Sequence, residues 1–161
     1  MIKIRSGIGY DIHRLGKGDA LFLGGIKVSS SLKAKAHSDG DVLIHSLIDS
    51  LLGAMAEPDI GELFPDTDPG LQGVSSSVLL EQVRSLMENN GYEIINIDCV
   101  IITETPKISN FKKEIRENLA RVLGIPISAI NVKGKTKERL DSVGRGEAIE
   151  SYAVSMIRSK K

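Results

Sequence analysis

The segment VLIHSLIDSLLGAMA, residues 42–56, constrains the fold of this chain more than any other feature of its sequence. Apolar side chains recur in it every three or four residues, which is the spacing of one face of an α-helix. This stripe consists of Val42, Ile44, Leu47, Ile48, Leu51, Leu52 and Met55. Asp39 or Asp41 stands where the N-cap of the helix is expected. An apolar face of this width predicts a helix that packs against another layer of the fold.

Strand-like and helix-like segments alternate along the rest of the chain. A second helix is expected from the serine run at 75–77 to Gly91, and a third from about 110 to 123. Ser109 is the expected cap of the third helix, and Gly124 and Pro126 should end it. Strands are predicted at residues 2–13, 20–28 (with a bulge or bend at Gly24-Gly25), 93–103, 131–136 and 147–158.

This order of elements predicts an α+β fold, with helices packed on one face of a mixed sheet. Its 161 residues are expected to form a single domain, residues 1–161. Residues 57–73 are rich in Asp, Pro and Gly and form one long connection. Connections of that length are uncommon in a compact domain, so this segment is predicted to be functional or disordered.

The balance of charge excludes one class of function. The 21 basic side chains match 21 acidic ones, without the clustered positive charge of a protein that binds duplex nucleic acid. The single cysteine, Cys99, lies in an apolar segment, so we expect it to be buried and reduced. The N-terminus lacks the apolar core of a signal peptide, and no apolar run is long enough to span a membrane. We therefore expect a cytoplasmic protein without nucleic-acid or membrane partners.

The three histidines all lie within the first 45 residues, each near an aspartate. Asp11 and His13 are two residues apart on a predicted strand and should face the same side. His45 lies on the predicted helix, with Asp41 and Asp49 four residues before and after it on the same face. Two imidazoles and one carboxylate, with an open fourth position, are the ligand set of a catalytic zinc or similar site. Asp49 would then accept the second ring N–H of His45.

The same residues have an ordinary alternative, in which the histidines are partly buried polar groups hydrogen-bonded to the nearby aspartates. Further segments of the chain suit a phosphate ligand. They are His37-Ser38 before a helix, TPK at 105–107, the Lys-rich VKGKTKERL at 132–140, and Arg145 between two glycines. Each of these alone is more often a solvated surface or a turn. Together with the metal ligands they favour metal-assisted chemistry on a phosphate.

Several motifs of this chain resemble those of a known family. GYDIH, AHSDGDVLIH, DIGELFPDTDP, the TPK turn and T-K-E…GRGE occur here in the order seen in the 2-C-methyl-D-erythritol 2,4-cyclodiphosphate synthases. The resemblance extends from about Ile8 to Ile157. That family converts 4-diphosphocytidyl-2-C-methyl-D-erythritol 2-phosphate, a cytidine diphosphate substrate, into the cyclic diphosphate and releases CMP. It implies an α+β homotrimer whose active sites lie between subunits.

The resemblance also implies roles for individual residues. Asp11, His13 and His45 would hold zinc or manganese, and Glu138 would hold magnesium or manganese with the substrate diphosphate. His37 and Thr136 would be catalytic residues: His37 and Ser38 would contact phosphate, and Thr136 would orient the β-phosphate. Arg145 would bind phosphate in this site or near the central cavity. Ile12, beside two of the metal ligands, would also contact substrate. The remaining substrate contacts would be Asp59, Ile60, Gly61, Phe64, Pro65, Asp66, Thr67 and Asp68 at the erythritol end, and Thr103, Glu104, Thr105, Pro106, Lys107, Ile108, Ser109, Gly134, Lys135 and Lys137 around the cytosine.

Two other readings use the same residues. In the first, the chain is a metal-dependent nucleotide pyrophosphohydrolase, with water as the nucleophile. In the second, it is a non-catalytic trimer that binds a metal or a nucleotide, and Thr136 and Glu138 have no role. The three readings differ in their products, which are a cyclic diphosphate with CMP, linear phosphates, or none.

Overall fold

A computed structural model describes residues 1–160, in which five strands form one mixed sheet in the order β4-β1-β7-β5-β6. Neighbouring strands run antiparallel except β5 and β6, which are parallel. The strands span β1 Ile4–Lys17, β4 Leu32–Lys35, β5 Tyr92–Ile102, β6 Ile130–Lys135 and β7 Ala148–Ser159. The last of these confirms the strand predicted at the C-terminal end. The α+β prediction with a mixed sheet is confirmed as well.

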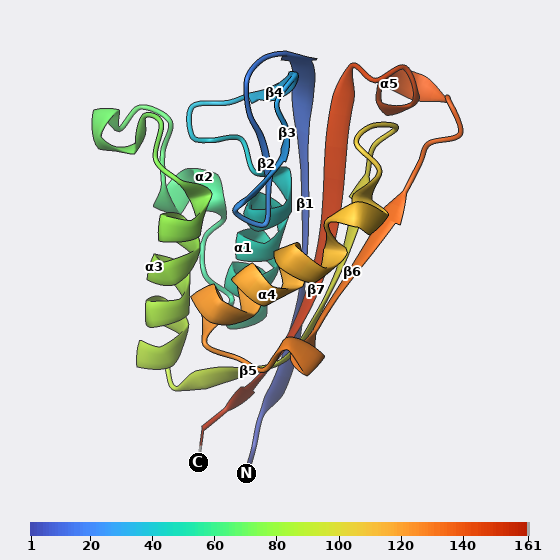
Figure 1. The fold of residues 1–161 in the computed structure, drawn as a ribbon. Helices are drawn as coiled ribbons and strands as arrows, with labels where there is room; N and C mark the ends of the chain where they lie inside the picture. The colour runs from blue at the N-terminus through green and yellow to red at the C-terminus, as the bar shows by residue number, and fades with distance from the viewer. Residues whose placement is uncertain (161) are drawn as a thin grey trace.

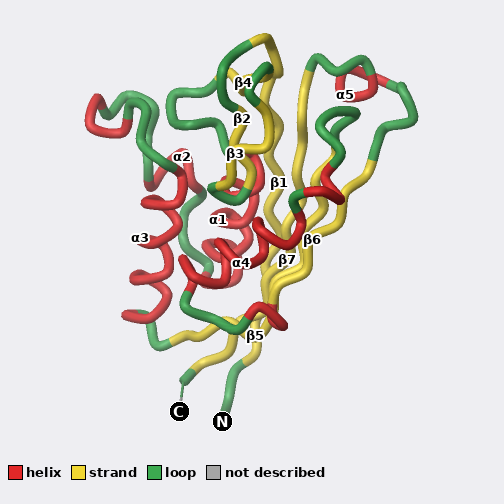
Figure 2. Tube along the Cα trace, in the orientation of Figure 1, coloured by secondary structure: helices red, strands yellow, loops and turns green. Residues whose placement is uncertain are grey.

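The three long helices lie together on one face of this sheet, and the two chain ends lie side by side at one end of it (Figures 1 and 2). They are α1 Val42–Met55, α3 Ser76–Asn89 and α4 Lys112–Leu123. Two short helices, α2 Ile60–Leu63 and α5 Asp141–Gly144, and three 3-10 turns at Pro69–Leu71, Ile108–Asn110 and Ile127–Ala129 complete the helical elements. The segment 57–73 is therefore structured, with α2 and a 3-10 turn inside it. Within residues 1–160, no helix is long and apolar enough to cross a membrane.

Helix α1 packs unusually close to strand β1. A Cβ atom added to Gly9 of β1 would lie 1.8 Å from the backbone oxygen of Ser46 in α1. The hydroxyl of Ser46 lies 2.9 Å from that of Ser151 on β7, so a small polar pair fills the narrow space beside the glycine. This close approach brings the first turn of α1, which carries His45, next to β1.

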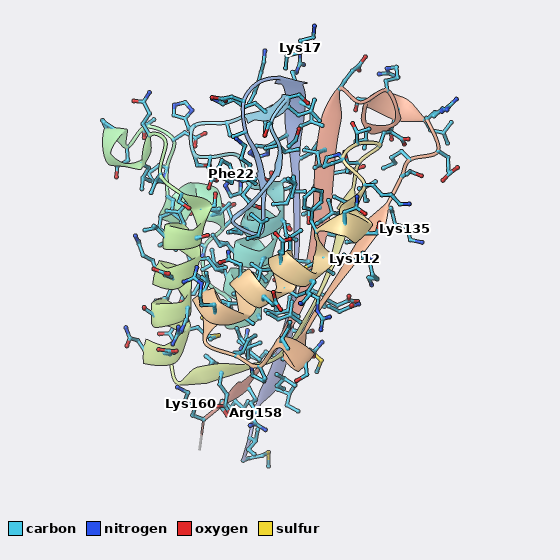
Figure 3. The ribbon with its side chains drawn as sticks, in the orientation of Figure 1. Lys17, Phe22, Lys112, Lys135, Arg158 and Lys160 are labelled. Carbon is cyan, nitrogen blue, oxygen red and sulfur yellow. The ribbon has the colours of Figure 1, made fainter. Side chains whose placement is uncertain are left out.

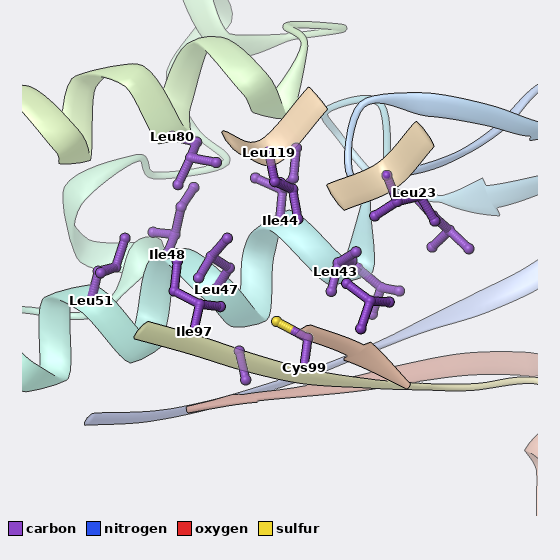
Figure 4. Packing of buried hydrophobic residues seen from close by; sticks show 14 of the residues in the cluster. Leu23, Leu43, Ile44, Leu47, Ile48, Leu51, Leu80, Ile97, Cys99 and Leu119 are labelled. Atoms are coloured by element: carbon purple, nitrogen blue, oxygen red, sulfur yellow. The ribbon is translucent and has the colours of Figure 1, made fainter. Parts of the chain in front are cut away.

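The core lies between α1 and the sheet. Figure 4 shows Ile97 and Cys99 of β5 beneath Leu43, Leu47 and Ile48 of α1. Cys99 is fully buried and unpaired, as predicted. Burial raises the pKa of its thiol to about 12 because a thiolate is poorly solvated there.

The segment predicted as one strand at 20–28 is instead a hairpin of β2 Leu21–Leu23 and β3 Ile26–Ser29. Gly24 and Gly25 form its two-residue turn, with φ of +60° and +76°, a conformation that glycine adopts without strain. Of the two alternatives predicted at these glycines, the bend is confirmed as a tight turn, and the bulge is wrong. Strand β4 was not predicted: its sequence LKAK alternates apolar and polar residues, but it is only four residues long and consists mostly of Lys and Ala, which are depleted in strands.

The ends of the helices show which of the predicted capping residues form caps. Asp41, and not Asp39, caps α1 by accepting a hydrogen bond from the Ile44 N–H at 3.0 Å. Its buried carboxylate also accepts the N–H groups of Gly24 and Gly25, which ties the hairpin to the helix. The prediction that Ser109 caps the third helix is wrong, since a 3-10 turn occupies 108–110 and α4 begins at Lys112. Gly124 ends α4 in the left-handed conformation, as predicted.

Candidate metal centre and substrate pockets

The structure places two histidines and an aspartate around one point. Asp11 and His13 point from β1 toward α1, and His45 reaches them from the first turn of that helix. The Nδ1 atoms of His13 and His45 lie 3.1 Å and 3.0 Å from Oδ2 of Asp11. The three donor atoms all lie within 4.8 Å of one another, and each residue is partly buried. The ligands predicted from sequence spacing therefore meet in space.

The side chains of this cluster fit a divalent cation. Nδ1 of His13 is buried and has no hydrogen-bond partner within the described chain, although Oδ2 of Asp11 is close. Burial by itself would raise the pKa of Asp11, but the imidazoles of His13 and His45 outweigh it and lower this pKa to about 2. Asp11 is thus a carboxylate at neutral pH. One carboxylate oxygen and two imidazole nitrogens facing an open pocket are ligands typical of zinc and related metals.

The second ring nitrogen of His45 has different partners from those predicted. Nε2 lies 2.9 Å from the hydroxyl oxygen of Ser76 and 3.1 Å from that of Ser38. The predicted Asp49–His45 hydrogen bond is wrong: Oδ1 of Asp49 instead accepts the N–H of Ile60 at 2.8 Å, at the start of α2. Helical spacing correctly predicted that Asp49 lies on the same face of α1 as His45. Its hydrogen-bond donor, however, is a backbone N–H of the 57–73 segment.

A pocket of about 460 Å³ opens beside the cluster. Arg14 and Lys35, which are paired across β1 and β4, add two cationic side chains that the sequence analysis did not single out. In the sequence, the only indication that they belong to the site is that Arg14 follows His13 directly and Lys35 precedes His37 by two residues. Of the predicted residues, Asp59 caps α2 and does not line this pocket, and neither do Pro65 and Thr67. The predicted residues that do line it are Ile12, His13, His37, Ser38, His45, Ile60, Gly61, Phe64, Asp66 and Asp68.

A second pocket of about 400 Å³ lies at the carboxyl ends of the parallel strands β5 and β6. Lys112 and Lys135, whose side chains are labelled in Figure 3, both line it, and Lys112 was not predicted. Thr103 donates a hydrogen bond to the carbonyl of Thr105 at 2.6 Å, which closes the loop that follows β5. The predicted residues in its lining are Thr103, Glu104, Pro106, Lys107, Ile108, Ser109, Gly134, Lys135 and Thr136.

The loop after β6 carries the remaining predicted residues. The Thr136 hydroxyl donates a hydrogen bond to Oε1 of Glu138 at 2.6 Å. Lys137 points elsewhere, with Nζ 2.6 Å from the buried carboxylate of Glu150. Arg145 lines neither of the two pockets; its guanidinium pairs with Glu147 at 3.0 Å and is exposed.

The two pockets have no lining residue in common. The first is built on β1 and β4 and the second on β5 and β6, and β7 lies between β1 and β5 in the sheet. Within residues 1–160, a single chain therefore does not bring Thr136 and Glu138 into the pocket of the Asp11 cluster.

This α+β fold, with its Asp-His-His cluster, defines a known class of protein. Residues 4–158 match the YgbB family model, and the chain belongs to this family. The 2-C-methyl-D-erythritol 2,4-cyclodiphosphate synthase of Brachyspira hyodysenteriae is 47% identical over 158 residues, covering 98% of this chain and all of that protein.

Solved structures agree with this assignment. IspF from Plasmodium falciparum in complex with CDP is 42% identical, with a TM-score of 0.87, and the match covers 98% of this chain and 97% of that one. The bifunctional IspDF from Campylobacter jejuni is 38% identical with a TM-score of 0.96. The match covers 99% of this chain but only 43% of that protein, so this chain corresponds to one part of it.

Proposed function

We infer that this chain is an enzyme with the activity of the synthases to which it is similar. It converts 4-diphosphocytidyl-2-C-methyl-D-erythritol 2-phosphate into 2-C-methyl-D-erythritol 2,4-cyclodiphosphate and CMP. Full-length similarity to a named synthase supports this activity. The observation that carries it is the Asp11–His13–His45 cluster, whose two histidines line a pocket together with Arg14 and Lys35. The relatives give no support to the pyrophosphohydrolase alternative.

The reaction needs little covalent chemistry from the protein. The nucleophile is the 2-phosphate of the substrate itself, which is already an anion, so no serine or cysteine nucleophile is required. The enzyme must hold this phosphate in line with the bond to CMP and neutralise the charge that would repel it. Arg14 and Lys35 line the pocket as fixed cations, and His37 and Ser38 line it as groups that can hydrogen-bond phosphate oxygens.

We assign Asp11, His13 and His45 to a zinc or manganese ion and Glu138 to a magnesium or manganese ion that binds with the substrate diphosphate. Such cations supply Lewis-acid polarisation of the phosphoryl oxygens. The hydrogen bond from Thr136 to Glu138 supports a joint role, because it holds the two side chains together where Thr136 can orient the β-phosphate. The pocket around Thr103–Ser109 and Gly134 has the size for a cytosine ring, and a CDP complex is known for a related protein.

We further propose that the chain acts as a homotrimer with each active site between two subunits. The separation of the two pockets supports this arrangement, because a neighbouring subunit would have to supply Thr136 and Glu138 to the Asp11 cluster. The sheet face opposite the helices also carries exposed apolar side chains, as an interface would. They are Ile4, Ile8, Tyr10, Ile12, Tyr152 and Val154. Arg145 stays a candidate phosphate ligand in this assembly, and a cytoplasmic location stays a prediction.

Phosphorus NMR tests the activity directly. The metal-loaded protein is incubated with the substrate and magnesium, and the products are identified by their phosphorus resonances. A cyclic diphosphate together with CMP is the expected result. Linear phosphates would instead establish a hydrolase, and an unchanged spectrum would contradict both enzyme assignments.

Metal analysis of three matched variants tests the ligand assignment. His13→Ala and His45→Ala should each lose the tightly bound metal, because each removes one of three protein ligands. His37→Ala should keep it, because His37 lines the pocket but lies outside the cluster. Full metal occupancy in the first two variants would refute the assignment.

A further inference from the structure

Ser76 lies behind the metal centre and is held by an aspartate. It is the first residue of α3 and is fully buried. Its backbone N–H donates to Oδ2 of Asp39 at 2.9 Å, and its hydroxyl oxygen lies 2.5 Å from Oδ1 of the same carboxylate. The same hydroxyl oxygen lies 2.9 Å from Nε2 of His45. Asp39, Ser76 and His45 thus form a continuous chain of hydrogen bonds.

The chemistry of the three groups sets the direction of this chain. An ionised carboxylate only accepts hydrogen bonds, so the single hydroxyl hydrogen of Ser76 points to Asp39. Toward His45, the Ser76 oxygen can then only accept, which requires a hydrogen on Nε2 of the imidazole. The Ser38 hydroxyl, 3.1 Å from the same nitrogen, offers a second acceptor. It receives the N–H of Gly40 at 3.3 Å on its other side.

A neutral imidazole with its hydrogen on Nε2 has a lone pair on Nδ1. In this structure, Nδ1 is the atom that faces Oδ2 of Asp11, at 3.0 Å. Two atoms that face each other with lone pairs, and with no hydrogen between them, suit a cation bound between them. With the opposite tautomer, the hydrogen would point at Asp11 and a metal ion would have to displace it.

We propose that Asp39 and Ser76 are positioning residues for the metal centre, which keep the hydrogen of His45 on Nε2 and so leave Nδ1 free to bind the metal. This inference rests on the proposed function, because it takes the Asp11 cluster as a metal site. It gives Asp39 and Ser76 the supporting role that spacing alone had predicted for Asp49. Asp39 also holds the N-terminus of α3 in place, so the same carboxylate joins this helix to the metal centre.

Zinc affinity of the metal-stripped full-length protein, measured by competition with a chelator, tests the proposal. Ser76→Ala should weaken zinc binding about 10- to 100-fold, the usual loss when the partner of a metal-bound histidine is removed. Ser75→Ala is the matched control, because this exposed neighbour makes no capping hydrogen bond through its side chain and should bind zinc as the wild type does. Asp39→Asn should weaken binding in the same direction, because its amide has one acceptor oxygen for three donors, which are the N–H and the hydroxyl of Ser76 and the N–H of Asp41.

Nitrogen NMR of histidine-labelled protein gives a readout that a purely structural role would not change. The zinc-loaded wild type should show a hydrogen on Nε2 of His45 that exchanges slowly with water, and Ser76→Ala should make this exchange faster. A hydrogen on Nδ1 of zinc-loaded His45 would overturn the proposal. Unchanged zinc affinity and exchange in Ser76→Ala would overturn it too, while leaving the metal assignment intact. A wild type that binds neither zinc nor manganese would refute the metal assignment of the proposed function, and this inference with it.

Discussion

Replacement of Gly9 by alanine should disrupt the metal centre through the packing of the helix that carries His45. The new Cβ would lie 1.8 Å from the carbonyl oxygen of Ser46 and 2.7 Å from the backbone nitrogen of Ser50, both in α1. Neither atom belongs to a flexible side chain, so the helix and the strand must separate. Ordinary contact begins at 3.4 Å, which requires a local displacement of about 1.6 Å.

The expected effect has two parts. Overpacking of a well-packed core costs about 1 to 3 kcal/mol, and a clash between two backbone segments should fall at the upper end, at about 3 kcal/mol of unfolding free energy. The displacement also moves His45 relative to Asp11, two residues from Gly9 on β1. Because metal–ligand distances tolerate only about 0.2 Å of change, zinc affinity should fall sharply even in molecules that remain folded.

Two assays separate these effects. Denaturant unfolding at one fixed protein concentration gives the loss of stability, and chelator competition under native conditions gives the loss of zinc affinity. Gly16→Ala on the same strand is the matched control, since its Cβ would meet nothing within 4 Å. It should leave both quantities unchanged or raise stability slightly. A Gly9→Ala protein with wild-type stability and wild-type zinc affinity would refute the claim that close packing of α1 on β1 sets the metal geometry.

Three further predictions concern other parts of the molecule. Cys99 should react very slowly with thiol reagents at pH 8 in the native protein and rapidly in denaturant. The reason is that a pKa of about 12 leaves roughly one thiol in ten thousand ionised at that pH. Fast labelling of the native protein would contradict its burial. Lys137→Met should lower stability, because Glu150 is buried and loses its cation. The hydrogen bond with Glu150 raises the pKa of Lys137 in the folded state, so this stabilisation is complete below the unfolded value of 10.5 and is lost as the pH rises through the folded value. Unfolding measurements should therefore show the full difference between variant and wild type at pH 8 and a decreasing difference as the pH rises above 10.5, and a difference that does not change with pH would disprove the pairing. Glu138→Gln should keep the metal at the Asp11 cluster but abolish the magnesium or manganese dependence of turnover; unchanged dependence would exclude Glu138 as a ligand of the second ion.

Some of the site could be predicted because it depends on local periodicity. The two-residue repeat of a strand put Asp11 and His13 on one side, and the apolar stripe of 42–56 fixed which face of the helix His45 would occupy. The helix boundaries set by Gly91 and Gly124 follow from backbone conformations that glycine adopts without strain. Motif order along the chain was specific enough to identify the family.

The sequence by itself therefore determined the α+β class, the candidate metal ligands and the family. Only the tertiary structure decided which donor or acceptor each polar group meets. Asp49 binds the backbone of Ile60 and not His45, while Ser76, 31 residues from His45, occupies the place predicted for Asp49. The physical reason is that a hydrogen bond depends on tenths of an ångström and on direction, and both are set by how α1, α3 and β1 pack. Spacing along the chain carries no information about such contacts between separate elements.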